Sequence, residues 1–280
     1  MKAGLAVADE ACRLCGAPSP KRVGAARVLG RHEAVYASCA QCDFLQVSAP
    51  GWLDEAYSEA LSDLDTGVLV RTQDMICRVR LLGLALGIAP DDPCLDFGGG
   101  YGLFVRAARD AGLNFHWHDR RARNLLARGF DGRLGDSYRL VTAFEVFEHL
   151  LDARADLDAI FGPRPGAVLA GTALHSGFDP DWYYLFPETG QHIGFFSERT
   201  MAFVAERYGY RALCSPQVTL FLPVSEPLEG LRLRWLAKLV RFPYSRTARL
   251  SRWWLQRRHP LVSRTWNDHL LLKRRLSASP

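Results

Sequence analysis

A short apolar segment followed by a glycine-rich turn constrains the fold of this chain more than any other feature. Residues 93–97 (PCLDF) predict a buried strand, residues 98–102 (GGGYG) a tight loop, and residues 103–111 an amphipathic helix. This order is typical of the nucleotide-binding corner of an open α/β sheet, where ligands bind beyond the carboxyl ends of the strands. The sequence therefore predicts an α/β fold with a cofactor site at this turn.

The spacing of the glycines indicates which cofactor the turn would hold. Gly98, Gly100 and Gly102 give the pattern D-x-G-x-G-x-G, which begins at Asp96. A dinucleotide fingerprint requires G-x-G-x-x-G, and Leu103 stands where its third glycine would be. A dinucleotide places its pyrophosphate on the helix N-terminus. S-adenosylmethionine (SAM) has no pyrophosphate, so the pattern favours SAM.

Four segments, taken in order, resemble class I SAM-dependent methyltransferases. They are the motif LDFGGGYG (95–102), a strand at 114–118 that ends at Asp119, a strand at 140–144 that runs into EVFEHL (145–150), and a strand at 167–172 whose following loop ends in QHIGFFS (191–197) before a helix at 198–208. The likeness covers roughly residues 50–225. It implies a Rossmann-like, mostly parallel sheet of seven strands.

The resemblance also implies a cofactor site. Asp119 would hold both ribose hydroxyls, and Glu145 would contact the cofactor side of the pocket. Arg71, on a helix expected at 66–86, would reach the methionine carboxylate of SAM, although an ordinary surface arginine is the alternative. Tyr138 and Arg139 stand where the family often has an acid, so the adenine contact is left to Asp136. The predicted cofactor-binding residues are Asp96, Gly98, Gly100, Gly102, Asp119, Glu145 and Arg71.

Two histidines are the candidate catalytic residues. A hydroxyl or carbon acceptor must lose a proton during methyl transfer, which requires a base. His149 and His192 lie in the two family-like segments that face the cofactor pocket, so either could be the base or orient the acceptor. The alternatives are that His149 caps a helix and His192 bonds a loop, and that Glu148 is a solvated helical carboxylate. The aromatic segment 182–188 could close over the acceptor or only cover the sheet edge.

Two CxxC pairs predict a structural zinc ribbon within residues 1–50. Cys12, Cys15, Cys39 and Cys42 supply the four thiolates that tetrahedral zinc prefers. The alternatives are two disulfides or unrelated thiols. No export signal precedes them, and a reducing compartment disfavours disulfides. Some sugar- and glycan-modifying members of the resembled superfamily carry such a module. The remaining cysteines (Cys77, Cys94 and Cys214) lie in apolar contexts and are expected to be buried.

The C-terminal segment is strongly basic and rich in tryptophan. Residues 231–280 hold thirteen Lys and Arg against one acid, a net +12, so the first 230 residues carry −7 of the total +5. Four of the seven tryptophans lie there, and helices are expected at 231–240 and 248–255. This pattern suits an anionic membrane surface through residues 231–275, or nucleic acid. A hairpin packed on the body with a solvated basic face is the alternative.

The sequence as a whole predicts a zinc module (1–50), a methyltransferase domain (51–225) and a basic helical tail (226–280). The expected activity is C- or O-methylation of a small acceptor, such as a sugar, a glycan precursor or a secondary metabolite. An RNA methyltransferase and a SAM-binding module without catalysis are the alternatives. No apolar run reaches the length of a membrane span. The expected location is cytoplasmic, including the inner membrane surface.

Overall fold

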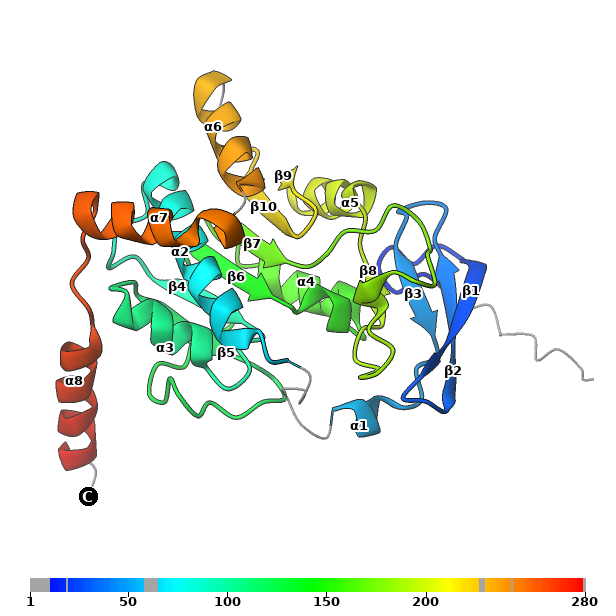
Figure 1. Ribbon diagram of the computed structural model, residues 1–280, viewed down its shortest axis with the longest axis horizontal. Helices are drawn as coiled ribbons and strands as arrows, with labels where there is room; N and C mark the ends of the chain where they lie inside the picture. The colour runs from blue at the N-terminus through cyan, green and yellow to red at the C-terminus, as the bar shows by residue number, and fades with distance from the viewer. Residues whose placement is uncertain (1–10, 19, 58–64, 227–229, 243, 279–280) are drawn as a thin grey trace, which may run out of the picture.

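The computed structural model describes residues 11–18, 20–57, 65–226, 230–242 and 244–278. Its larger sheet has the strand order β5-β4-β6-β7-β10-β9 (Figure 1). The four strands β5, β4, β6 and β7 are parallel, and β10 runs antiparallel to both of its neighbours. The strands are β4 (Cys94–Phe97), β5 (Phe115–His118), β6 (Leu140–Phe144), β7 (Val168–Gly171), β9 (Tyr210–Cys214) and β10 (Val218–Pro223). The predicted Rossmann-like α/β class is confirmed.

The described part of this sheet has six strands rather than the expected seven. Beyond β5, a single parallel bridge between Trp117 and Asp131 stands where a further strand would pair. The segment around this bridge contains Gly129, Gly132 and Gly135. Glycines weaken strand pairing because they lose more backbone entropy on folding than other residues and have no side chain to pack. The expectation of seven strands is therefore corrected to six strands and one bridge.

Helices cover both faces of the larger sheet. On one face, α4 (Ala153–Phe161) and α5 (Glu198–Tyr208) bury Leu157 and Val204. On the other, α2 (Val68–Leu86) and α3 (Leu103–Asp110) bury Leu82 and Val105. The predicted helix at 198–208 is confirmed as α5. Its N-cap is Ser197, whose side chain accepts a hydrogen bond from the Thr200 amide. This double covering leaves the carboxyl ends of the parallel strands available for a site.

A second, antiparallel sheet joins the N-terminal segment to the part of the chain that forms the larger sheet. It has the order β1-β2-β3-β8, from β1 (Lys21–Val28), β2 (His32–Ser38), β3 (Leu45–Ser48) and β8 (Gly194–Phe195). Strand β8 belongs to the chain that follows β7, and it pairs with β3 through Leu45 and Phe195. The short helix α1 (Leu53–Ala56) follows this sheet. The N-terminal sheet is therefore hydrogen-bonded, through β3 and β8, to the segment that carries His192.

The C-terminal tail folds into three helices, two of which overlap the predicted positions (Figure 1). They are α6 (Gly230–Arg241), α7 (Tyr244–Arg258) and α8 (Thr265–Ala278). Leu236 and Val240 of α6 enter the core beside α2 and α3. Asp268 of α8 is only 4% exposed and pairs with Arg109 at 2.8 Å. None of the described helices is long and apolar enough to cross a membrane.

Candidate active site

The glycine loop between β4 and α3 adopts the backbone that its sequence predicts. Gly98, Gly100 and Gly102 have φ of 71°, 52° and 86°, a left-handed region that favours glycine. A Cβ at Gly98 would lie 2.5 Å from Val146 Cγ2, and one at Gly102 would lie 2.9 Å from Asn124 Oδ1. Among the described residues, apart from its chain neighbours, a Cβ at Gly100 would meet no atom within 4 Å. Gly98 and Gly102 are therefore needed for packing, whereas Gly100 faces open space.

Asp119 lies at the rim of this loop and fixes its backbone. Its Oδ2 accepts a hydrogen bond from the Gly100 amide at 2.9 Å. Its Oδ1 accepts from the amides of Arg121 and Ala122 at 2.7 and 2.8 Å. Each carboxylate oxygen can accept more than one hydrogen bond, so these contacts leave capacity for a ligand. The carboxylate thus lies beside Gly100.

Asp96 lies beneath the loop instead of at its rim. It is 4% exposed, and its Oδ1 accepts a hydrogen bond of 2.7 Å from the Thr142 hydroxyl. Burial raises the pKa of this carboxyl from 3.8 to about 7. Its contacts in the structure are with the protein, so Asp96 supports the loop from below.

A buried group of acids and a tyrosine lies where β6 ends. Glu145 has a φ of 52°, which is unusual for a residue with a side chain. The hydroxyl of Tyr184, in the short 3-10 helix η2 (Tyr183–Leu185), donates to Glu148 Oε1 at 2.7 Å and lies 3.4 Å from Glu145 Oε2. Burial, and then the charge of Glu148, raise the pKa of Glu145 to about 8. The expectation that Glu148 is solvated is wrong, because Glu148 is 0% exposed.

The two candidate catalytic histidines meet beside these acids. The rings of His149 and His192 are perpendicular, with centroids 4.9 Å apart. His149 Nδ1 lies 3.0 Å from the Gln191 carbonyl oxygen and 2.9 Å from the Tyr57 hydroxyl. His192 Nδ1 lies 2.7 Å from the Tyr184 carbonyl oxygen. Burial lowers the pKa of His149 to about 4, so its imidazole is neutral at pH 7.

Two arginines border this group. Arg71 of α2 forms two hydrogen bonds with Asp65, at 2.7 and 2.6 Å, and these bonds raise its pKa. Its side chain is 42% exposed, and the charge of Glu145 also raises its pKa, after the larger effect of Asp65. The guanidinium of Arg121 lies over the ring of Tyr57, 4.5 Å from its centroid. Sequence reasoning missed Arg121 and Tyr184 as site residues, although the aromatic segment 182–188 was the available signal for Tyr184.

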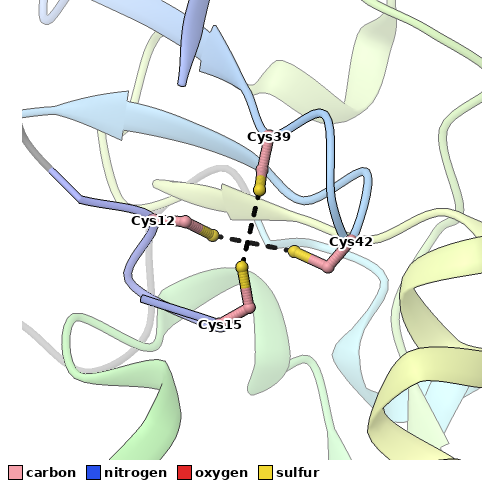
Figure 2. Close-up of side chains that lie close together, drawn as sticks. All are labelled: Cys12, Cys15, Cys39 and Cys42. Carbon is pink, nitrogen blue, oxygen red and sulfur yellow. Dashed lines mark hydrogen bonds between the residues drawn. The ribbon is translucent and has the colours of Figure 1, made fainter. Parts of the chain in front are cut away.

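The four cysteines of the CxxC pairs converge on one point (Figure 2). Their sulfur atoms all lie within 4.8 Å of one another, with Cys12 and Cys42 at 3.7 Å and Cys15 and Cys39 at 3.5 Å. Four sulfurs around a tetrahedral zinc ion, at about 2.3 Å each, lie about 3.8 Å apart. The donor set and its spacing therefore fit a zinc ion.

The first CxxC turn also holds the segments that carry the two histidines. The guanidinium of Arg13, between Cys12 and Cys15, donates to the carbonyl oxygen of Ile193, next to His192. It also donates to the carbonyl oxygens of Leu150 and Leu151, at 3.4 and 3.3 Å, just after His149. One side chain of the N-terminal segment therefore contacts the backbone of both segments that carry the candidate histidines.

Comparison with known proteins places this geometry in a family. A model described as a methyltransferase domain matches residues 73–215. No curated protein matches the chain.

Three solved structures are similar to parts of the chain. Human N-acetylserotonin methyltransferase with SAM is 14% identical over 62% of this chain and 66% of its own, with a TM-score of 0.40. Magnesium protoporphyrin IX methyltransferase of Synechocystis PCC 6803 with SAM is 14% identical over 62% and 90%, with a TM-score of 0.41. An O-methyltransferase of neocarzinostatin biosynthesis, with S-adenosylhomocysteine and a naphthoic acid, is 16% identical over 62% and 61%, with a TM-score of 0.40.

Proposed function

Because this chain belongs to the methyltransferase-domain family and is a SAM-dependent methyltransferase, we propose that it methylates a small hydroxyl-bearing acceptor, with sugars and glycan precursors as the first class to test. The observation that carries this proposal is the group formed by Glu145, Glu148, Tyr184, His149 and His192. It lies where β6 ends, next to the glycine loop between β4 and α3. Polar side chains gathered at the carboxyl end of a parallel strand are typical of a substrate site.

The cofactor would lie against the open side of Gly100. No other part of the described chain comes within 4 Å of a Cβ built there, which is consistent with room for a nucleoside. Asp119, which already accepts the Gly100 amide, would accept the ribose hydroxyls with its remaining lone pairs. Arg71 and Glu145 would contact the methionine end. SAM supplies a methyl group on a positive sulfur, which leaves as a neutral thioether.

The residues of the chain would align the acceptor and help it lose its proton. Methyl transfer requires the acceptor atom, the methyl group and the sulfur to lie in line, so positioning supplies much of the rate. Nδ1 of each histidine faces a backbone carbonyl oxygen, which leaves Nε2 of His149 and His192 to act at the acceptor site. Tyr184 and Glu148 would fix the ring of His192. The carbonyl oxygen of Tyr184 accepts a hydrogen bond from His192 Nδ1, and the hydroxyl of Tyr184 donates to Glu148.

Radiolabelled SAM and a panel of nucleotide sugars, free sugars and phenols test the reaction. For an accepted substrate, we expect His149→Ala or His192→Ala to lower kcat by about 10²- to 10⁴-fold, the usual contribution of acid–base groups. SAM affinity, measured by calorimetry, should change little in both variants. His269→Ala, an exposed histidine of α8, is the control and should keep the wild-type rate. Equal rates in all four proteins would contradict the assignment of the histidines. SAM binding without turnover on any acceptor would favour a binding module.

We also propose that the four cysteines hold a structural zinc ion. The support is the S···S spacing of 3.5 to 3.7 Å within the two closest pairs and the burial of Cys12, Cys39 and Cys42. All four positions are thiols and no open position is evident, which is typical of a structural rather than a catalytic site. The ion would hold the two CxxC turns and, through Arg13, the histidine segments.

For the tail we propose association with an anionic membrane surface. Trp235, Trp253 and Trp266 are 62%, 55% and 67% exposed, and cations lie over two of these rings, Lys238 over Trp235 and Arg257 over Trp253. Such pairs of indole and cation suit the interface of a charged bilayer.

Vesicle sedimentation tests the tail with point variants, because deletion of α6 would remove Leu236 and Val240 from the core. We expect the wild type to sediment with anionic vesicles and to stay in solution with zwitterionic ones. The triple variant Trp235→Ala, Trp253→Ala, Trp266→Ala should stay in solution with both, and Trp182→Ala is the control. Equal sedimentation of the triple variant and the wild type would contradict the proposal. Salt-sensitive binding to RNA alone would instead support a nucleic-acid acceptor.

A further inference from the structure

We propose that Glu148, His149 and His192 bind a divalent transition-metal ion at the acceptor site, separate from the cysteine cluster. A carboxylate oxygen and one ring nitrogen from each histidine all lie within 4.8 Å of one another. The residues come from two segments, the 3-10 helix η1 (Phe147–His149) after β6 and the loop before β8. Ligands of one ion lie about 3 to 3.5 Å apart, so the cluster would contract on binding.

Both imidazoles are held as metal-binding histidines usually are. Nδ1 of His149 lies 3.0 Å from the Gln191 carbonyl oxygen, and Nδ1 of His192 lies 2.7 Å from the Tyr184 carbonyl oxygen. A carbonyl oxygen only accepts hydrogen bonds, so Nδ1 carries the proton in each ring. This tautomer leaves the lone pair of Nε2 available to an ion, and the carbonyls fix the ring orientations. His149 Nε2 lies 3.9 Å from Glu148 Oε1.

The carboxylate of Glu148 gives independent evidence for a cation at this position. Its side chain is 0% exposed. Oε1 accepts the Tyr184 hydroxyl, but among the described residues Oε2 has no hydrogen-bond partner. An unpaired carboxylate oxygen that is shielded from water is costly. A cation between Glu148 and the two imidazoles would pair that oxygen and neutralise the charge.

The ligand set indicates the class of ion. Two imidazole nitrogens and one carboxylate suit Mn²⁺, Fe²⁺, Co²⁺ or Zn²⁺, whereas Mg²⁺ and Ca²⁺ prefer oxygen ligands throughout. Three protein ligands leave coordination positions open for a substrate. The cysteine cluster, with four soft thiolates, selects zinc instead. Mn²⁺ is therefore a probe that separates the two sites.

The role of the ion rests on the proposed function. An acceptor hydroxyl bound at an open position would have a lowered pKa, because the ion stabilises the alkoxide. Its proton would pass to water. The alkoxide oxygen would then form a bond to the methyl carbon while the carbon–sulfur bond breaks, and the electron pair would stay on sulfur to give S-adenosylhomocysteine. His149 and His192 would thus assist proton loss by holding the ion.

Mn²⁺ titration of the full chain tests the site by calorimetry and by the electron paramagnetic resonance of free Mn²⁺. The protein is free of SAM and holds a single equivalent of zinc, which the four thiolates take up first. We expect one Mn²⁺ per chain. His149→Asn and His192→Asn should weaken binding by more than the roughly 10- to 100-fold seen when only a supporting residue is lost. Glu148→Gln keeps the size of the side chain and an acceptor for Tyr184, so it should stay folded and also lose Mn²⁺. His269→Ala should bind as the wild type does.

The results would distinguish a failure of the metal site from a failure of the proposed acceptor class. No Mn²⁺ binding by the wild type, or equal binding by wild type and the three ligand variants, would overturn the metal site. If methyl transfer still occurred in a protein that failed to bind Mn²⁺ at these residues, the proposed function would stand without the metal site. If Mn²⁺ bound at these residues but no acceptor were methylated, the metal site would stand and the proposed acceptor class would fail. Circular dichroism of each variant checks that the fold is kept.

Discussion

Replacement of Cys42 by serine should remove the zinc ion and unfold the N-terminal sheet. The binding free energy of a structural zinc ion is about 10 to 16 kcal/mol in small zinc peptides at pH 7, which equals or exceeds the total stability of a typical domain. Cys42 is 0% exposed and shares a core cluster with Phe44, Phe147 and Phe196, so the loss would reach the site. We expect about one zinc per wild-type chain by elemental analysis, none in Cys42→Ser, and a markedly lower thermal midpoint.

The matched control is Cys214→Ser. This cysteine lies in β9, is not one of the four converging cysteines, and is only partly buried. It should keep its zinc and unfold near the wild-type temperature. Equal zinc content and equal melting of Cys42→Ser and the wild type would show that the four thiols serve no metal.

The stability of the protein should fall as the pH rises from about 4 to about 7, and Asp96→Asn should remove much of this fall. Burial raises the pKa of Asp96 from 3.8 to about 7. The folded state thus keeps a proton that the unfolded state loses near pH 4. Below pH 4 this proton makes its full stabilising contribution to the free energy of unfolding, and by pH 7 that contribution is lost. It amounts to on the order of 4 kcal/mol, at about 1.4 kcal/mol for each pKa unit.

Chemical denaturation at pH 5 and pH 8 measures this effect. The amide introduced by Asp96→Asn keeps an oxygen that can accept the Thr142 hydroxyl, so the variant should be less sensitive to pH and more stable than the wild type at pH 8. Asp91→Asn is the control, because Asp91 is 92% exposed. Parallel stability profiles for wild type and Asp96→Asn would show that Asp96 does not hold its proton in the folded state.

Local patterns predicted the parts of the fold that local chemistry determines. The glycine loop requires left-handed backbone at Gly98 and Gly102, and Ser197 supplies a cap whose partner is three residues away. Both signals are contained in a few consecutive residues, so the sequence predicted the tight loop at 98–102 and the helix at 198–208.

Contacts between distant segments could not be predicted in this way. Asp268 reads as one acid in a basic tail, yet it is buried because Arg109, 159 residues away, pairs with it. Glu148 reads as a helical surface acid because its partner Tyr184 comes from another loop. The pairing of β3 with the two-residue strand β8 likewise has no local signal. Such features depend on tertiary packing, which periodicity does not encode.

Arg13 connects the first cysteine turn to the two segments that carry His149 and His192, because its guanidinium donates to carbonyl oxygens in both. On the proposed roles of the four cysteines in zinc binding and of the two histidines in methyl transfer, thiol oxidation or loss of zinc would release these segments while the glycine loop between β4 and α3 kept its geometry. Methylation would then respond to the redox state of the thiols and to the supply of zinc without any change in SAM concentration.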